Sequence, residues 1–131
     1  MAALVTTINV QDSTKNINYP SGSISITTGD GEQSGVLNTV ASPTEASITI
    51  DSQITGGNGP GLMLLRNLST TAAETIDFGT ATTVYNITLN ANDGVEMNWV
   101  AVPLKSTVTT IYYASASGSP KFWYKIFERG A

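Results

Sequence analysis

The most regular pattern in the chain lies at residues 84–99, which read VYNITLNANDGVEMNW. Tyr85, Ile87 and Leu89 alternate with polar residues, Asn-Asp-Gly interrupts the pattern, and a second alternation runs to Trp99. Alternation with a period of two is typical of a strand with one buried face, and Asp-Gly is a favoured hairpin turn. The stretch therefore predicts a β-hairpin, with Trp99 on the apolar side of its second strand.

The same alternation recurs along the chain and stops each time at Gly, Pro, Asp or Asn. It predicts further strands at residues 4–10, 23–28, 36–40, 46–50, 62–68, 75–78, 108–114 and 121–127. The run at 62–68 is apolar at nearly every position, which is typical of a strand covered on both faces. Residues 11–22 and 29–45 show the least pattern and are predicted to be long loops or arms, and one helical turn is expected at 69–74.

Length and composition favour a single folded domain. The chain has 131 residues, of which 40% are hydrophobic and 12% charged, and 42 are Thr, Ser or Asn. Those three residue types favour strands and turns over helix interiors. We predict an all-β protein with one antiparallel, jelly-roll-like β-sandwich over residues 1–131, about eight strands and little or no helix. Residues 1–22 are expected to form an extended arm or an edge strand.

The residue types that are missing exclude many activities. The chain has no His and no Cys, so it cannot form the usual zinc sites, iron–sulfur clusters, disulfides or catalytic Cys–His and Ser–His–Asp groups. Its net charge of −4 has the wrong sign for binding nucleic-acid phosphates. Residues 1–7 have no basic region and no sustained apolar stretch, so we expect neither a signal peptide nor a membrane segment there. We expect no metal, no cofactor, no nucleic-acid or membrane partner, and no enzymatic activity.

Two motifs suggest chemistry, and each has a plainer interpretation. Residues 56–61, GGNGPG, are rich in glycine, but no Gly-Lys-Ser/Thr follows and the next segment is a predicted strand, unlike a phosphate loop. A loop tip or a close subunit contact is the favoured interpretation. Glu96 with Asp93 or Glu128 could supply the paired carboxylates of a glycoside hydrolase. Glu96 also fits the solvent face of an amphipathic strand, and we favour that interpretation.

Aromatic residues concentrate near the C-terminus. In the last predicted strand, Phe122, Tyr124 and Ile126 share one face, and Trp123 and Phe127 share the other. Aromatic rings pack in cores, anchor protein interfaces or stack on sugar rings. We expect Trp123 or Tyr124 to be exposed in an isolated monomer. The candidate interface residues are Tyr112, Tyr113, Phe122, Trp123, Tyr124 and Phe127.

Several segments in the C-terminal third resemble a known group of proteins. They are residues 84–89, the turn at 92–94, the strand through Trp99, the step at 111–116 and the ending at 122–128. Together they are similar to small virion proteins of tailed bacteriophages. The resemblance implies a β-sandwich that decorates a capsid or builds tail and fibre parts, usually as a trimer or another symmetric oligomer.

We therefore expect a non-enzymatic phage virion protein, made in the host cytoplasm and located in the virion. The leading role is a capsid decoration or stabilising subunit, whose partners are its own copies and a major capsid or tail protein. The alternative is a receptor- or glycan-binding β module of a tail or fibre. Exposed Trp123, Tyr112 or Tyr113 in a shallow groove would favour the alternative, and the same rings buried between protomers would favour the structural subunit.

Overall fold

The computed structural model describes residues 3–8, 11–12, 17–18, 22–91 and 98–130. These residues form a five-stranded sheet, a four-stranded sheet and a two-stranded ribbon, all antiparallel. In spatial order, the first sheet contains β1 (Ala3–Ile8), β4 (Gly22–Asn38), β11 (Lys121–Arg129), β6 (Pro60–Asn67) and β9 (Trp99–Pro103). The second contains β5 (Ala46–Thr49), β10 (Thr110–Ser115), β7 (Ile76–Gly79) and β8 (Ile87–Leu89).

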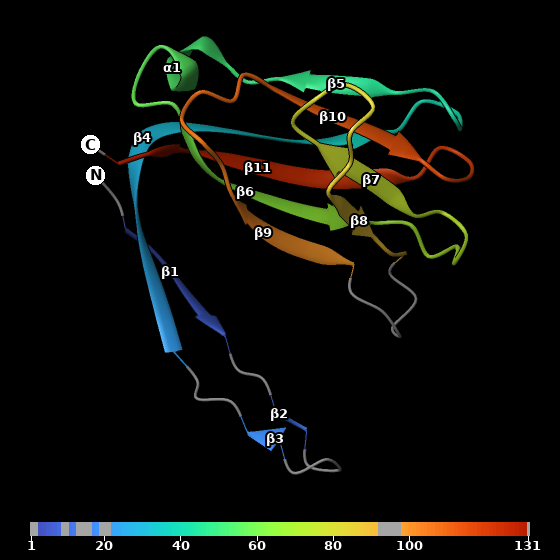
Figure 1. Ribbon diagram of the computed structural model, residues 1–131, viewed down its shortest axis with the longest axis horizontal. Coiled ribbons are helices and arrows are strands. Elements are labelled where there is room, and N and C mark those ends of the chain that lie inside the picture. The colour runs from blue at the N-terminus through green and yellow to red at the C-terminus, as the bar shows by residue number, and fades with distance from the viewer. Residues whose placement is uncertain (1–2, 9–10, 13–16, 19–21, 92–97, 131) are drawn as a thin grey trace.

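The two sheets face each other as the layers of a sandwich (Figure 1). From β4 onward the chain passes repeatedly between them, because β4, β6, β9 and β11 belong to the first sheet and β5, β7, β8 and β10 to the second. The order β4-β11-β6-β9 opposite β5-β10-β7-β8 is that of a jelly roll, which combines two Greek keys. The predicted fold class, an antiparallel jelly-roll-like β-sandwich, is confirmed.

Inward side chains of both sheets fill the space between the layers. Phe122 of β11 is fully buried, and its ring centroid lies 5.1 Å from that of Phe78 in β7 and 4.8 Å from that of Tyr113 in β10. Both ring pairs meet edge to face, a geometry that aromatic pairs favour. At one end of the sandwich the short helix α1 (Ser52–Thr55) adds the fully buried Ile54 to this core.

β4 is a 17-residue strand with two sets of partners. Residues 22–27 pair with β1, and residues 28–38 pair with β11. The part next to β1 leaves the sandwich on the side of the first sheet, and the ribbon of β2 (Gln11–Asp12) and β3 (Ile17–Asn18) lies beyond it (Figure 1). We call the hairpin of β1 and residues 22–27 the arm. The arm is continuous with the sheet, because β4 belongs to both.

The prediction of a loop at residues 29–45 is wrong for residues 29–38. Residues 29–38 belong to β4, which runs past the glycines without a turn. A Cβ added at Gly29 or Gly31 would lie within 3.1 Å of the Glu128 carboxylate oxygen Oε2. These glycines therefore allow a close approach of backbone to side chain instead of marking a chain reversal.

The hairpin predicted across residues 84–99 is also wrong. β8 pairs with β7 in the second sheet, whereas β9 pairs with β6 in the first, so the chain crosses between the layers here. Residues 92–97, which contain the predicted turn, lie outside the described residues. Residues 69–74 contain no helix, but a single turn closes where the Glu74 N–H donates to the Thr71 carbonyl at 2.9 Å. Alternation located the strands, but it indicates only which side of a strand is buried and leaves its neighbours undetermined.

Candidate binding face

The outer surface of the first sheet carries large apolar side chains. Strand register aligns its outward residues in rows across β4, β11, β6 and β9. The first row is Val36, Trp123, Arg66 and Trp99; the second is Ser34, Lys125, Leu64 and Ala101; the third is Glu32, Phe127, Leu62 and Pro103. We call the side chains of these three rows the tryptophan face.

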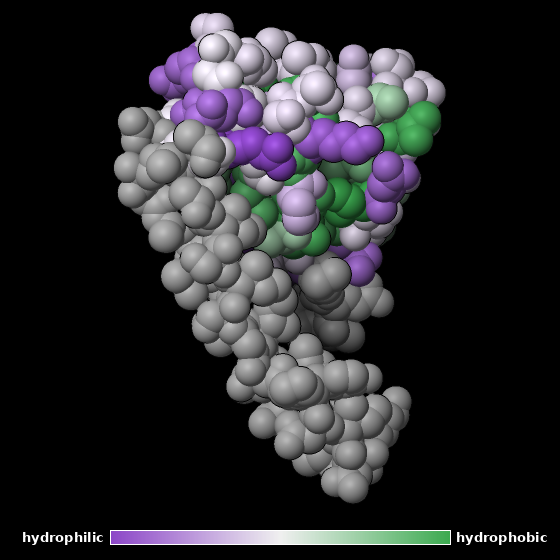
Figure 2. Space-filling model, turned by 60° about the vertical axis from the view of Figure 1, so that its left-hand side comes forward, coloured by the Kyte–Doolittle hydropathy of each residue, from purple (hydrophilic) through white to green (hydrophobic). Residues whose placement is uncertain are grey.

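The first row is the most exposed part of this apolar surface. Trp99 is 57% exposed and Val36 is 55% exposed, so large apolar groups meet solvent at both ends of the row. Trp123 is half-buried between them, and Arg66 is exposed. In Figure 2, hydrophobic side chains reach the surface among hydrophilic ones in the lower part of the sandwich. A contiguous exposed apolar patch usually marks an interaction site, whereas isolated apolar side chains do not.

A shallow groove of about 480 Å³ follows the first row. Its lining includes Trp123, Arg66 and Trp99, with Leu64 as a further apolar wall and Asn98 as a further polar group. Because neighbouring strands lie about 4.8 Å apart, the backbones of Trp123 on β11 and Trp99 on β9 are about 10 Å apart, and Arg66 of β6 lies between them.

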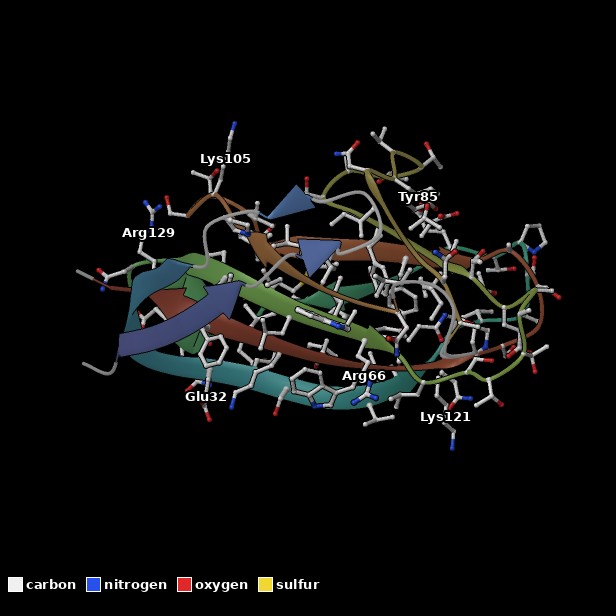
Figure 3. The ribbon with its side chains drawn as sticks, turned by 90° about the horizontal axis from the view of Figure 1, so that it is seen from below. Glu32, Arg66, Tyr85, Lys105, Lys121 and Arg129 are labelled. Atoms are coloured by element: carbon white, nitrogen blue, oxygen red, sulfur yellow. The ribbon has the colours of Figure 1, made fainter. Side chains whose placement is uncertain are left out.

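Arg66 differs from the other cation of the tryptophan face. Lys125 Nζ lies 3.6 Å from Glu32 Oε2 and 5.1 Å from the centroid of the Phe127 ring. Arg66 has no hydrogen bond or ion pair within the part of the chain that the structure describes. Figure 3 looks onto this face and shows Arg66 well away from Glu32, nearer the opposite end of the sheet. The guanidinium group of Arg66 therefore has its donors available to a ligand.

A buried amide holds the end of β6 next to the groove. Asn67 is fully buried, and its Nδ2 donates to the carbonyl oxygens of Glu74 at 2.8 Å and Leu89 at 3.4 Å. Its backbone N–H donates to the Asn98 carbonyl at 2.8 Å, and Asn98 Nδ2 donates back to the Asn67 carbonyl at 3.3 Å. Asn67 thus connects β6 to the second sheet and to the start of β9, where the groove has one of its walls.

The structure divides the six predicted interface aromatics between the core and two outer surfaces. Those buried in the core are Tyr113, Phe122 and Tyr124. Those half-buried on an outer surface are Trp123 and Phe127 on the first sheet and Tyr112 on the second. A core ring cannot reach a partner while the sandwich is intact, so the interface role stays a prediction for the second group alone.

Arg66 and Trp99, which carry the chemistry of the groove with Trp123, were not among the candidates from the sequence. The alternation up to Trp99 predicted a buried indole, yet Trp99 is exposed and faces outward. A signal for this was present, because Val100 and Val102 begin a new inward alternation that places Trp99 outside. Arg66 had no recognisable signal, since a single cation in an apolar run belongs to no motif.

The outer surface of the second sheet is made of small polar side chains. Its outward residues are Ser47, Thr49, Asp77, Thr88, Thr110, Tyr112 and Ala114. We call them the threonine face. Thr88 Oγ1 donates to Asp77 Oδ1 at 2.6 Å, a cross-strand contact typical of a solvated sheet surface.

Glu128 has a structural role at the end of the sandwich near α1. Its Oε2 accepts a hydrogen bond from the Gly31 N–H at 2.8 Å, and its Oε1 accepts one from the Asn58 N–H at 2.9 Å. A Cβ at Gly57 would clash with the same carboxylate. Gly57 thus packs against a buried side chain of its own chain, whereas a Cβ at Gly59 would meet the Ser106 backbone and one at Gly61 would meet Arg129. Asp93 and Glu96, the other residues of the hydrolase hypothesis, lie outside the described residues.

Tyr85 forms a second carboxylate contact, on the other side of the molecule from α1. Its hydroxyl donates to Glu45 Oε2, which also accepts the N–H of Thr83 at 2.8 Å. The hydrogen bond to Glu45, followed by burial and nearby negative charge, raises the pKa of Tyr85 to about 12. This contact connects the turn after β7 to the segment before β5.

A second cavity of about 350 Å³ opens at the edge where β8 and β9 meet. Ile87, Val102 and Val108 contribute apolar walls, and Lys105 is its charged lining residue. Across the described ranges, no group of three or more His, Cys, Asp or Glu residues could hold a metal ion. The groove on the tryptophan face combines an exposed cation with one exposed and one half-buried indole, so it is the stronger candidate site.

Comparison with known proteins identifies no relative of the chain. No protein-family model, no curated protein and no solved structure matches it. In the ranges that the structure describes, no helix is long and apolar enough to cross a bilayer. The function must therefore be inferred from the geometry of this chain.

Proposed function

We propose that the protein is a non-enzymatic structural subunit of a phage virion, which decorates or stabilises the capsid as a symmetric homo-oligomer. The observation that supports this proposal is the arm. Among the described strands, β1 lies at the end of the first sheet and has β4 as its single neighbour. A free strand edge presents unpaired N–H and C=O groups, and a two-stranded hairpin alone is only marginally stable in water. Pairing with a strand of a neighbouring copy would give the free N–H and C=O groups of β1 hydrogen-bond partners and would stabilise the hairpin.

The fold and the position of the arm agree with this role. Jelly rolls are found in viral capsid domains as well as in lectin domains, although a fold by itself does not identify a function. The arm projects on the side of the first sheet, so a copy that pairs with it would also lie near the tryptophan face (Figure 1).

Light scattering of the full chain across a dilution series tests the oligomer. We expect a closed oligomer, such as a trimer, that dissociates only on strong dilution. A strict monomer at every concentration would overturn the proposal. Thr6→Pro removes a backbone N–H from β1 and should shift the mass toward the monomer. The matched control Thr6→Ala keeps that N–H and should leave the oligomer unchanged.

The virion assignment has its own test. Purified phage particles that carry this gene should contain the chain as a stoichiometric component when analysed by mass spectrometry. If the chain were absent from banded particles and present in the lysate, the virion assignment would be wrong. The proposal of a homo-oligomer would be unaffected.

The receptor- or glycan-binding module is supported as an alternative by one observation, the groove between Trp123 and Trp99. The groove and the free edge of β1 are different surfaces of the molecule, so one chain could perform both functions.

A further inference from the structure

We propose that the groove across Trp123, Arg66 and Trp99 binds an acidic oligosaccharide, with a sugar carboxylate on Arg66 and sugar rings on the two indoles. This inference gives the alternative function a ligand class, and it does not depend on the virion role. The juxtaposition that supports it is the first row of the tryptophan face, where three neighbouring strands present an indole, a guanidinium and an indole.

The charge of the ligand follows from Arg66. Residues 1–100 contain only two basic side chains, Lys15 and Arg66, against nine acidic ones. An exposed guanidinium with no described partner is therefore an exception on an acidic body. Guanidinium groups recognise carboxylates through two parallel hydrogen bonds, which a single lysine amine cannot match. A carboxylate ligand would provide the partner that Arg66 lacks among the described residues.

The sugar character of the ligand follows from the two indoles. Trp99 and Trp123 have apolar ring surfaces with an N–H at the edge, a combination suited to ligands that are apolar on one side and polar at the rim. The backbones that carry them are about 10 Å apart across β11, β6 and β9, a separation that a short oligosaccharide can span. The groove is open and shallow, and Asn98 adds a polar group to its lining, which suits a ligand with many hydroxyl groups.

A second copy of the chain related by a two-fold axis fits the same groove less well. A two-fold contact centred on the groove would bring the Arg66 side chains of both copies together. Two guanidinium groups without carboxylate partners repel each other, and burying them would add a desolvation cost. The observations thus favour a small acidic ligand, and a second copy becomes an outcome that the test must be able to detect.

The test begins with a glycan array that includes uronate and sialate oligosaccharides, followed by tryptophan-fluorescence titration of the full-length protein. The titration probes are hexagalacturonate and its neutral counterpart, maltohexaose. We expect array signals confined to acidic glycans and measurable affinity for hexagalacturonate only. Arg66→Gln should weaken that affinity at least about tenfold, as expected for loss of one charged hydrogen-bonded pair. Trp99→Ala should weaken it by a similar factor.

Matched controls separate the groove from general charge and from folding. Lys121→Gln removes one positive charge on the same sheet outside the groove lining and should change the affinity by less than about twofold at physiological salt. Tyr112→Ala removes an aromatic ring from the threonine face and should have no effect. Circular dichroism of each variant should match that of the parent, since Arg66 and Trp99 are exposed.

Three results would overturn the proposal. The first is an array without any acidic glycan above the neutral background. The second is equal affinity of the parent and Arg66→Gln for hexagalacturonate. The third is a change in the fluorescence of Trp123→Phe, whose remaining tryptophan is Trp99, on simple dilution together with a falling mass in light scattering, because it would show that a second copy occupies the groove. None of these results depends on whether the chain is found in virions, so failure of this inference is distinguishable from failure of the virion proposal.

Discussion

The two outer surfaces of the sandwich have the same backbone geometry and opposite chemistry. The threonine face consists mainly of hydroxyl side chains, which solvate a sheet without attracting partners. The tryptophan face places two indoles, a valine and an exposed guanidinium in one row. A jelly roll is stable with polar outer surfaces on both sheets, so the fold does not require the apolar groups of the tryptophan face. Their concentration on this face is the observation from which we propose that it binds a ligand.

The largest expected effect separates inward from outward aromatics on the same strand. Phe122→Ala should lower the free energy of unfolding by about 4 kcal/mol, because it leaves a cavity between the sheets. Trp123→Ala, one residue later on the tryptophan face, should lower it by about 1 kcal/mol. Urea unfolding of both variants measures the difference. An equal loss from Trp123→Ala would show that the indole is needed for the fold, and would break the contrast between the faces.

The next effect concerns the amide that connects the two sheets beside the groove. Asn67→Ala should lower the free energy of unfolding by about 3 kcal/mol, because buried carbonyl groups lose their donor. Asn98→Ala is the control, and it should cost about 1 kcal/mol since its amide donates a single long hydrogen bond. Denaturant titrations distinguish the two. A small loss from Asn67→Ala would mean that the groove is not held by this network.

A spectroscopic measurement compares the two indoles of the tryptophan face. Trp123→Phe leaves Trp99 as the remaining tryptophan, and its emission should be red-shifted and readily quenched by acrylamide, because this side chain is 57% exposed. Trp99→Phe leaves the half-buried Trp123, which should emit at shorter wavelength and be quenched less. If the remaining tryptophan were equally protected from acrylamide in both variants, the result would show that the groove is covered in solution.

The smallest expected effect is the pH dependence of stability that comes from the contact between Tyr85 and Glu45, which lies outside both faces. The pKa of Tyr85 is raised from its ordinary value of 10 to about 12 by its hydrogen bond to Glu45. The contribution of this contact to stability is therefore fully present below pH 10 and is lost as the pH rises from 10 to 12. The ionisation of Tyr85 is measured by the ultraviolet absorbance of its phenolate, taken as the difference between the parent and Tyr85→Phe during a pH titration. A difference titrating near pH 10 would contradict the contact.

The sequence predicted the fold class because alternation identifies strands independently of their partners. The pattern at residues 121–127 identified β11 and assigned its two faces correctly. It failed at residues 29–38, where the glycines that look like a turn leave space for Glu128, which is distant in the chain. It failed again after β8, because the choice between a hairpin and a crossover to the other sheet depends on the packing of the whole sandwich.

The candidate site was harder to predict from the sequence than the fold was. Late aromatics were recognised, and the structure places Trp123 among the residues that line the groove. Its partners Arg66 and Trp99 come from β6 and β9, which lie far apart in the sequence and meet only through strand register. A row across a sheet is a tertiary property, so composition and periodicity could not reveal it.

The continuity of β4 has a mechanical consequence. No linker separates the arm from the sandwich, because one strand serves both, and Thr28 is already paired with β11. A force on a docked arm would pass along the backbone into the ladder with β11, where many hydrogen bonds lie across the direction of pull and share the load. The orientation of the arm relative to the sandwich is therefore set by the course of one continuous strand.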